Sequence, residues 1–136
     1  MTTAVDSSVV LDVLVGASAH ASLDALRSAS LEGRLIVCEC VIAETRPAFA
    51  GNASFDAFLL DWGLELVPST RESASLAGEM LKRLLERRKE RTGRILADFL
   101  IGAHARVHAD RLLARDRGYY KDYFSDLVLW DPGRTG

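Results

Sequence analysis

Four carboxylates in this sequence are of a type and position that could do chemistry together. They are spread along the whole chain, at Asp6, Glu44, Asp98 and Asp116. Asp98 lies between Ala97 and Phe99 in a run of small and apolar residues, where an unpaired ionised group would be costly. Acids that share a site repel one another, and a divalent cation removes that conflict. Because no suitable cysteine or histidine cluster accompanies them, they favour Mg²⁺ or Mn²⁺ and metal-assisted cleavage of a phosphodiester bond.

Taken singly, these acids also have simpler interpretations. Asp6 and Asp116 could cap turns, and Glu44 could be a solvated residue on a helix. Their positions favour a shared site, because Asp6 follows a predicted strand at 3–5 and Asp116 follows one at 111–114. The other two are predicted on helices, Glu44 within 38–49 and Asp98 within 95–109. In an open α/β sheet, strand C-termini and helix N-termini converge on one edge, so all four could meet there.

Predicted strands alternate with predicted helices along the chain. The remaining strands are expected at 34–37, 64–68 and 126–130, and the remaining helices at 8–16, 22–33, 52–63 and 71–91. In the second helix, Leu23, Leu26 and Leu31 are expected to face inward. The alternation favours a three-layer α/β/α sandwich with a mainly parallel sheet of four or five strands.

Length and composition predict one domain over residues 1–136, with a core of about 4–131. The 49% of hydrophobic and 26% of charged residues are globular values, and no run approaches the roughly 18–20 apolar residues of a membrane span. The beginning of the chain carries Asp6 and Asp12, which do not suit a secretory signal, so we expect a cytoplasmic protein. A net charge of −2 argues against binding nucleic acid through bulk positive charge, although a local basic patch remains possible.

The order and context of these motifs resemble the PIN-domain ribonucleases, and within them the VapC-type toxins of bacterial toxin–antitoxin pairs. The motifs that carry the resemblance are Asp6-Ser7-Ser8, Glu44, Ala97-Asp98 with Ala103-His104-Ala105 behind it, and residues 115–120. The resemblance implies a PIN-like fold and an Mg²⁺- or Mn²⁺-dependent endoribonuclease that inhibits growth. Its catalytic metal ligands would be Asp6, Glu44, Asp98 and Asp116. It also implies an RNA substrate, a small cognate antitoxin protein and a homodimer.

Two positions depart from the family pattern or leave a choice. Family members often carry a hydroxyl residue two positions before the last acid, and this chain has Ala114 there, which leaves Ser8 as the hydroxyl candidate. Glu39 is the alternative to Glu44. We choose Glu44 because its offset from the strand at 34–37 suits the family pattern, whereas Glu39 lies in the first turn of the helix, where an acid favours the helix dipole. Arg115 and Arg117 flank the last acid and are the better candidates for contacting phosphate.

Other features have structural interpretations that compete with functional ones. The basic run at 82–94 could steer RNA, but a solvated helix face explains it at least as well. His104 and His108 are expected to be packed or surface histidines, and Cys38 and Cys40 to be buried inert thiols. The alternative functions are a PIN nuclease for RNA processing, a structure-specific DNA nuclease, and a catalytically silent PIN-fold binding protein. Four intact acids argue against the last of these.

Overall fold

The computed structural model describes residues 1–16, 20–88, 93–116 and 118–133, with the side chains of 88, 93 and 94 excepted. Its sheet has five strands, all parallel, in the order β3-β2-β1-β4-β5. The strands are β1 (Thr2–Val5), β2 (Arg34–Val37), β3 (Leu64–Leu66), β4 (Arg111–Leu113) and β5 (Leu129–Trp130). The sheet is centred on β1, where Ala4 is opposite Ile36 of β2 and Leu112 of β4. The predicted parallel α/β sheet is therefore confirmed.

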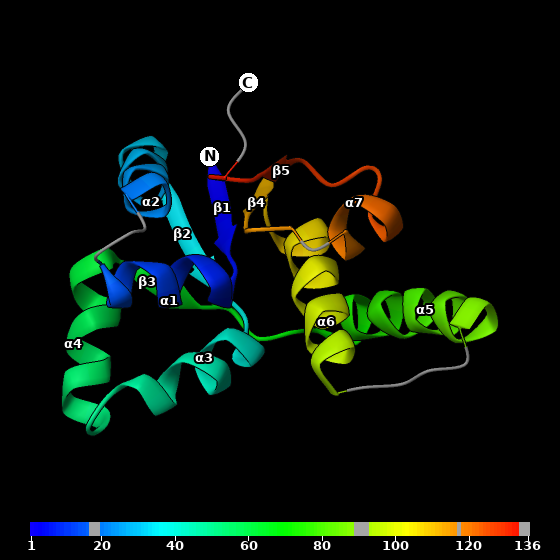
Figure 1. Cartoon of the computed structure of the whole chain (residues 1–136), viewed down its shortest axis with the longest axis horizontal. Coiled ribbons are helices and arrows are strands. Elements are labelled where there is room, and N and C mark those ends of the chain that lie inside the picture. The colour runs from blue at the N-terminus through cyan, green and yellow to red at the C-terminus, as the bar shows by residue number, and fades with distance from the viewer. Residues whose placement is uncertain (17–19, 89–92, 117, 134–136) are drawn as a thin grey trace.

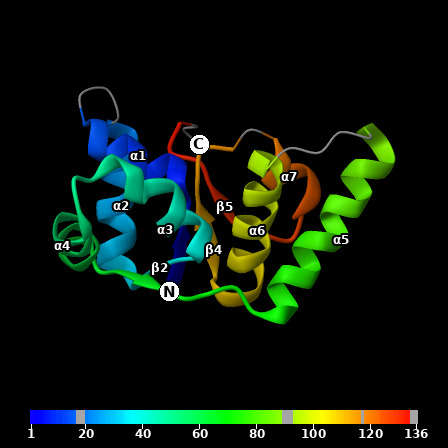
Figure 2. The ribbon, with the colours of Figure 1, turned by 90° about the horizontal axis from the view of Figure 1, so that it is seen from below.

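The helices cover the sheet in two groups (Figures 1 and 2). One group consists of α1 (Ser7–Val15), α2 (His20–Glu32), α3 (Glu39–Thr45) and α4 (Asn52–Trp62), with a 3₁₀ turn, η1 (Arg46–Ala48), between the last two. The other group consists of α5 (Arg71–Arg88), α6 (Gly93–His108) and α7 (Tyr119–Tyr123). In the described ranges no single helix is long and apolar enough to cross a membrane, and α1 and α2 reach that length and hydropathy only when taken together.

The central strands are buried over three successive residues each, because both faces of the sheet are covered. Residues Thr3–Val5 of β1 and Leu35–Val37 of β2 are all buried. A parallel sheet between two helical layers has no solvated face, so its strands lose the usual alternation of polar and apolar residues. Phe99 and Ile101 of α6 are buried in the same core. This continuous core holds the carboxyl ends of β1 and β4 side by side.

Helix and strand ends agree with the local chemistry, and some strands are shorter than predicted. The helix expected at 38–49, with Pro47 as the residue that ends or bends it, ends at Thr45 and continues as η1, because Pro47 has no N–H for a helical hydrogen bond. β3 contains only Leu64–Leu66 of the strand expected at 64–68. β5 contains only Leu129–Trp130 of the strand expected at 126–130. The helix expected at 71–91 is described as far as Arg88, and residues 89–92 of the basic run lie outside the described residues.

The inward orientation predicted for Leu31 is wrong. Its side chain is 89% exposed, whereas Leu26 on the same helix is fully buried. The buried face of α2 is formed by residues three or four apart, Ser22, Ala25, Leu26 and Ala29. Leu31 is two residues beyond Ala29, and two residues turn a helix by about 200°, so its side chain leaves on the opposite face. Leu23 is half-buried at the edge of the packed face.

Candidate active site

All four predicted acids line one cavity of about 440 Å³ at the carboxyl edge of the sheet. The complete lining is Asp6, Ser7, Ser8, Leu11, Glu44, Asp98, Arg115, Asp116, Tyr119 and Tyr120. Asp6 directly follows β1, and Asp116 comes three residues after β4, its neighbour in the sheet. In the strand order the chain turns away from β1 in both directions, to β2 and to β4. Such a switch point is where open α/β sheets form their binding crevices.

The carboxylate of Asp6 is held at both oxygens. It is the N-cap of α1, where Oδ2 accepts the backbone N–H of Ser8 at 3.1 Å and also the Ser8 hydroxyl. Oδ1 accepts the hydroxyl of Tyr120 at 2.9 Å. The Ser8 hydroxyl in turn accepts the N–H of Arg115 at 3.1 Å. Asp6 is only 6% exposed, so these hydrogen bonds fix the orientation of a buried carboxylate.

The two acids considered for α3 lie in different places. Glu44 lines the cavity, and its Oε1 accepts the Ser7 hydroxyl at 2.7 Å. Glu39 accepts the backbone N–H of Ser69, at 2.9 and 3.2 Å for its two oxygens, in the segment that follows β3. Glu39 does not line the cavity. Of the two alternatives, the geometry therefore favours Glu44.

The two later acids line the cavity from α6 and from the segment between β4 and α7. Asp98 on α6 is 6% exposed. Asp116 turns back toward α7, where its Oδ1 accepts the N–H groups of Gly118 at 2.8 Å and Tyr120 at 3.3 Å. Its Oδ2 accepts the N–H of Lys121 at 3.2 Å. Asp116 therefore caps a short helix as well as lining the cavity.

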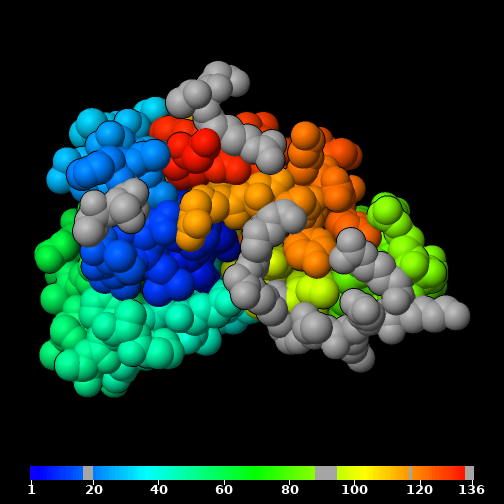
Figure 3. All heavy atoms as spheres, in the orientation of Figure 1, coloured from blue at the N-terminus to red at the C-terminus, as the bar shows by residue number. Residues whose placement is uncertain are grey.

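Of the two arginines expected at the site, the structure describes only Arg115. The guanidinium of Arg115 pairs with Asp12 of α1 at 2.9 Å and remains about half exposed. Figure 3 shows the segment after β4 lying against α1, although the two are far apart in the sequence. Arg115 lines the cavity, and Arg117 lies outside the described residues.

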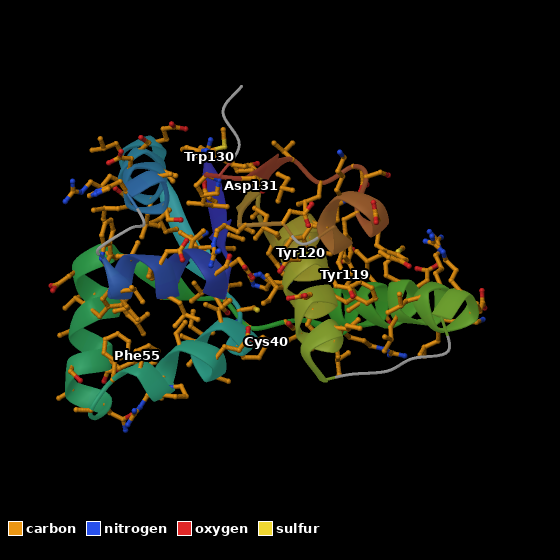
Figure 4. All side chains as sticks on the ribbon, viewed as in Figure 1. Cys40, Phe55, Tyr119, Tyr120, Trp130 and Asp131 are labelled. Atoms are coloured by element: carbon orange, nitrogen blue, oxygen red, sulfur yellow. The ribbon has the colours of Figure 1, made fainter. Side chains whose placement is uncertain are left out.

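Tyr120 is the functional candidate that the sequence did not reveal. Its side chain is buried, and Figure 4 shows it with Tyr119 where α7 begins, beside α6. Burial, together with the charges of Asp6 and Asp98, raises the pKa of Tyr120 well above its ordinary value. The phenol therefore stays protonated and donates to Asp6. In the sequence, Tyr120 lies in the motif at 115–120, four residues or one helical turn after Asp116, but nothing there indicates that it donates to Asp6.

The remaining candidates have structural partners. The Nε2 atom of His104 is 2.6 Å from the carbonyl oxygen of Val67, and Nε2 of His108 is 3.3 Å from Oγ1 of Thr70. Ala114 is buried and its N–H donates to the carbonyl of Trp130, so this position extends the strand and offers no hydroxyl. Asp131, which was not predicted, accepts the N–H of Asp116 at 3.2 Å.

The donors of the cavity fit a hard divalent cation. Four carboxylates and two serine hydroxyls provide only oxygen ligands, which Mg²⁺ and Mn²⁺ prefer. Three ligand atoms within 4.8 Å of one another are found among the described residues only at Cys38, Glu39 and Cys40. No three of the cavity carboxylates, all of which belong to the described residues, lie that close together, and Asp6, Glu44 and Asp116 accept hydrogen bonds from hydroxyl or amide groups. This spacing suits Mg²⁺, which keeps several of its water ligands and takes one or two carboxylates directly.

Comparison with known proteins identifies the family. The model of the PIN domain matches residues 3–124. This chain belongs to the PIN-domain family. No curated protein matches it. The family assignment agrees with the fold and with the resemblance in the acid motifs.

Solved PIN-fold complexes have the same architecture. FitAcB from Neisseria gonorrhoeae is similar with a TM-score of 0.69 and 17% identity, over 98% of this chain and 99% of that chain. VapBC2 from Rickettsia felis, bound to a DNA fragment from its promoter, is similar with a TM-score of 0.68 and 18% identity, over 96% of this chain and 98% of that chain. VapBC-1 from nontypeable Haemophilus influenzae is similar with a TM-score of 0.68 and 16% identity, over 98% of this chain and 100% of that chain. At these identities the likeness establishes the fold of this PIN domain.

Proposed function

We propose that this PIN domain is a divalent-metal-dependent endoribonuclease and the toxin of a toxin–antitoxin pair. It hydrolyses RNA phosphodiester bonds in the cytoplasm and inhibits growth until its antitoxin binds. The observation that carries the proposal is the convergence of four carboxylates, from the ends of β1 and β4 and from α3 and α6, on one cavity. The similar solved structures, VapBC2 and FitAcB among them, support an antitoxin partner.

In this mechanism Asp6, Glu44, Asp98 and Asp116 hold one or two Mg²⁺ or Mn²⁺ ions. When bound, such ions activate a water molecule and stabilise the negative charge that develops on the phosphate. No protein nucleophile is needed, and the family resemblance implies products that carry a 5′-phosphate and a 3′-hydroxyl.

The neighbouring side chains orient the ligands and the substrate. Ser8 and Tyr120 keep the carboxylate of Asp6 in one orientation, and Ser7 does the same for Glu44. Such hydrogen bonds to ligands raise both affinity and activity in metal sites. Arg115 lies at the cavity with part of its guanidinium exposed, in a position to pair with a substrate phosphate.

Asp98→Asn tests the assignment of the acids. The substitution keeps the shape of the side chain and removes its charge, so cleavage of RNA in Mg²⁺ or Mn²⁺ is expected to disappear while circular dichroism remains that of the wild type. Asp24→Asn is the matched control, because Asp24 is an exposed acid on α2 outside the cavity. Unchanged cleavage by the Asp98→Asn protein would exclude the assignment.

Induced expression tests the role as a toxin. Wild-type protein is expected to arrest growth and to create new RNA 5′ ends, and Asp98→Asn to do neither. Co-expression of a small protein encoded in the neighbouring reading frame is expected to restore growth and to co-purify with the chain. Cleavage in vitro without growth arrest would favour an RNA-processing nuclease, and wild-type protein that produces neither would favour a silent binding protein.

The oligomer is tested separately. We propose a homodimer, as expected from the family. Analytical ultracentrifugation of the purified chain is expected to give twice the monomer mass of 14.9 kDa. A monomer at every accessible concentration would contradict this part of the proposal and leave the nuclease assignment intact.

A further inference from the structure

A second group of ligand atoms lies where β2 meets α3. The thiols of Cys38 and Cys40 and a carboxylate oxygen of Glu39 are all within 4.8 Å of one another. Both cysteines are free thiols. In Figure 4, Cys40 lies at the beginning of α3, at the end of the helix that faces α6. None of the three residues lines the acidic cavity.

We propose that Cys38, Glu39 and Cys40 form a binding site for a borderline or soft divalent cation of the Zn²⁺ type, separate from the oxygen-lined cavity. Thiolates prefer such cations, whereas Mg²⁺ and Mn²⁺ prefer oxygen. Two sulfurs and one carboxylate leave a fourth tetrahedral position for water, which is the usual arrangement of three-ligand zinc sites.

The geometry needs little adjustment to accept the ion. Zinc lies about 2.3 Å from each sulfur, so two sulfurs in a tetrahedral site are about 3.8 Å apart. The ligand atoms here are within 4.8 Å of one another, so their separations exceed this value by at most about 1 Å. Cys38 has extended backbone, with φ −87° and ψ 172°, and Cys40 is in the first turn of α3. The change from strand to helix lets two residues so close in sequence present their thiols to one another.

Binding of the cation requires the two thiols to lose their protons. Each thiol that binds the cation gives up its proton to solvent. Cation affinity is therefore expected to rise with pH.

Ser69 provides an independent observation beside the third ligand. Its N–H donates to both oxygens of Glu39, at 2.9 and 3.2 Å, which is the type of contact that orients a ligating carboxylate. Its hydroxyl oxygen is buried and lacks a partner in hydrogen-bonding geometry. Buried polar atoms without a partner are rare, and an ordered ion or water beside them is a common explanation.

Co²⁺ is a suitable probe because its bond to thiolate absorbs in the near ultraviolet. The full-length, reduced chain is titrated with Co²⁺ and then with Zn²⁺. We expect a thiolate-to-cobalt charge-transfer band that saturates at one equivalent and is removed by one equivalent of Zn²⁺ but not by excess Mg²⁺. Cys40→Ser is expected to lose the band and to bind Zn²⁺ more than about tenfold more weakly.

Three further variants make the result specific. Asp98→Asn removes an acid of the cavity and is expected to keep the band, which separates the two sites. Glu39→Gln is expected to keep a weakened band, because both thiols remain. Cys38 is buried, so Cys38→Ser is compared only if its circular dichroism matches that of the wild type. A wild-type chain without the band, or a band unchanged in Cys40→Ser, overturns the proposal whatever the nuclease assays show.

Discussion

Asp6 receives hydrogen bonds from two parts of the chain that are far apart in sequence. Ser8 is the second residue of α1, and Tyr120 belongs to α7, 114 residues after Asp6. A buried carboxylate with charge-assisted hydrogen bonds is both stabilised and oriented. At the scale of single residues, the phenol of Tyr120 is therefore as much a part of the proposed site as the acids are.

Replacing Tyr120 by Phe isolates this contribution. The ring remains, but Oδ1 of Asp6 loses its donor, so we expect the unfolding free energy to fall by roughly 1.5–3 kcal/mol. Because the ligand is then less well oriented, metal-dependent cleavage should fall about 10–100-fold. The measurements are urea denaturation and the rate of RNA cleavage.

Tyr119→Phe is the matched control for this change. Tyr119 lines the same cavity and packs edge-on against Phe99, with ring centroids 5.8 Å apart, and the substitution preserves that packing. Wild-type behaviour is expected of it. Equal losses in both variants would mean that the effect does not come from the bond to Asp6.

At the scale of elements, the position of α7 depends on the absence of a side chain at Gly102. A Cβ placed there would lie 2.7 Å from Cε2 of Phe124 and 3.0 Å from Cδ1 of Tyr120. α6 and α7 therefore pack together at a residue without a side chain, and this contact delivers Tyr120 to Asp6. Asp116 holds the first turn of α7 by accepting the N–H groups of Tyr120 and Lys121 and that of Gly118, which precedes the helix.

Gly102→Ala is expected to be harmful, although alanine favours helices. Overpacking against Phe124 and Tyr120 should reduce the unfolding free energy by about 1–3 kcal/mol. Cleavage should fall as well, because Tyr120 is displaced. Gly78→Ala on α5 is the control, since a Cβ there meets nothing within 4 Å. The unfolding free energy of Gly78→Ala should rise by up to about 1 kcal/mol. Thermal denaturation distinguishes the two, and equal stabilisation of both would contradict the packing argument.

The orientation of α2 gives a second comparison at this scale. Leu26 is fully buried and Leu31 is exposed on the opposite face. Leu26→Ala should cost about 2–5 kcal/mol of unfolding free energy because it leaves a cavity in the core. Leu31→Ala should change it by less than about 0.5 kcal/mol. Urea denaturation of the two variants measures the difference, and similar losses would mean that α2 is rotated relative to the arrangement described above.

At the scale of the whole molecule, His104 links α6 to the segment after β3. Its ring is buried, and its Nε2 atom faces the carbonyl of Val67. Burial lowers the pKa of His104 below its ordinary value of 6.5, with the Val67 carbonyl acting in the opposite direction. Between the lowered pKa and 6.5, the unfolded chain binds more protons than the folded chain. The contribution of the neutral, buried His104 to the unfolding free energy is therefore fully present above pH 6.5, and it is lost as the pH falls below that value.

The prediction from this linkage concerns the pH dependence of unfolding. The urea midpoint of the wild type should fall as the pH is lowered from 7.5 to 5.5. His104→Gln keeps a side-chain N–H for Val67 but does not titrate, so its midpoint should change less over the same range. His108→Gln, one turn along α6, should retain the wild-type dependence. A wild-type midpoint that is constant over this range would exclude the effect.

Much of this architecture was predictable because it depends on local chemistry. The alternation of apolar strands and amphipathic helices sets the parallel sheet, and glycine at position 63, with φ 68°, ends α4 where expected. The four acids could be selected because each follows a strand or lies on a helix that reaches the same edge. Helix faces were less certain, as Leu31 shows, because an apolar residue near a helix end need not continue the buried stripe.

The sequence alone determined which acids were candidates and in which order the strands and helices come, since both depend on residue type and short-range periodicity. Only the tertiary structure decided that Glu44 and not Glu39 lines the cavity, that Tyr120 donates to Asp6, and that Asp116 caps α7. It also brought Ser69 to the carboxylate between the two cysteines. Contacts of this kind join residues that are distant in sequence, so they follow from how the helices pack on the sheet and have no local pattern.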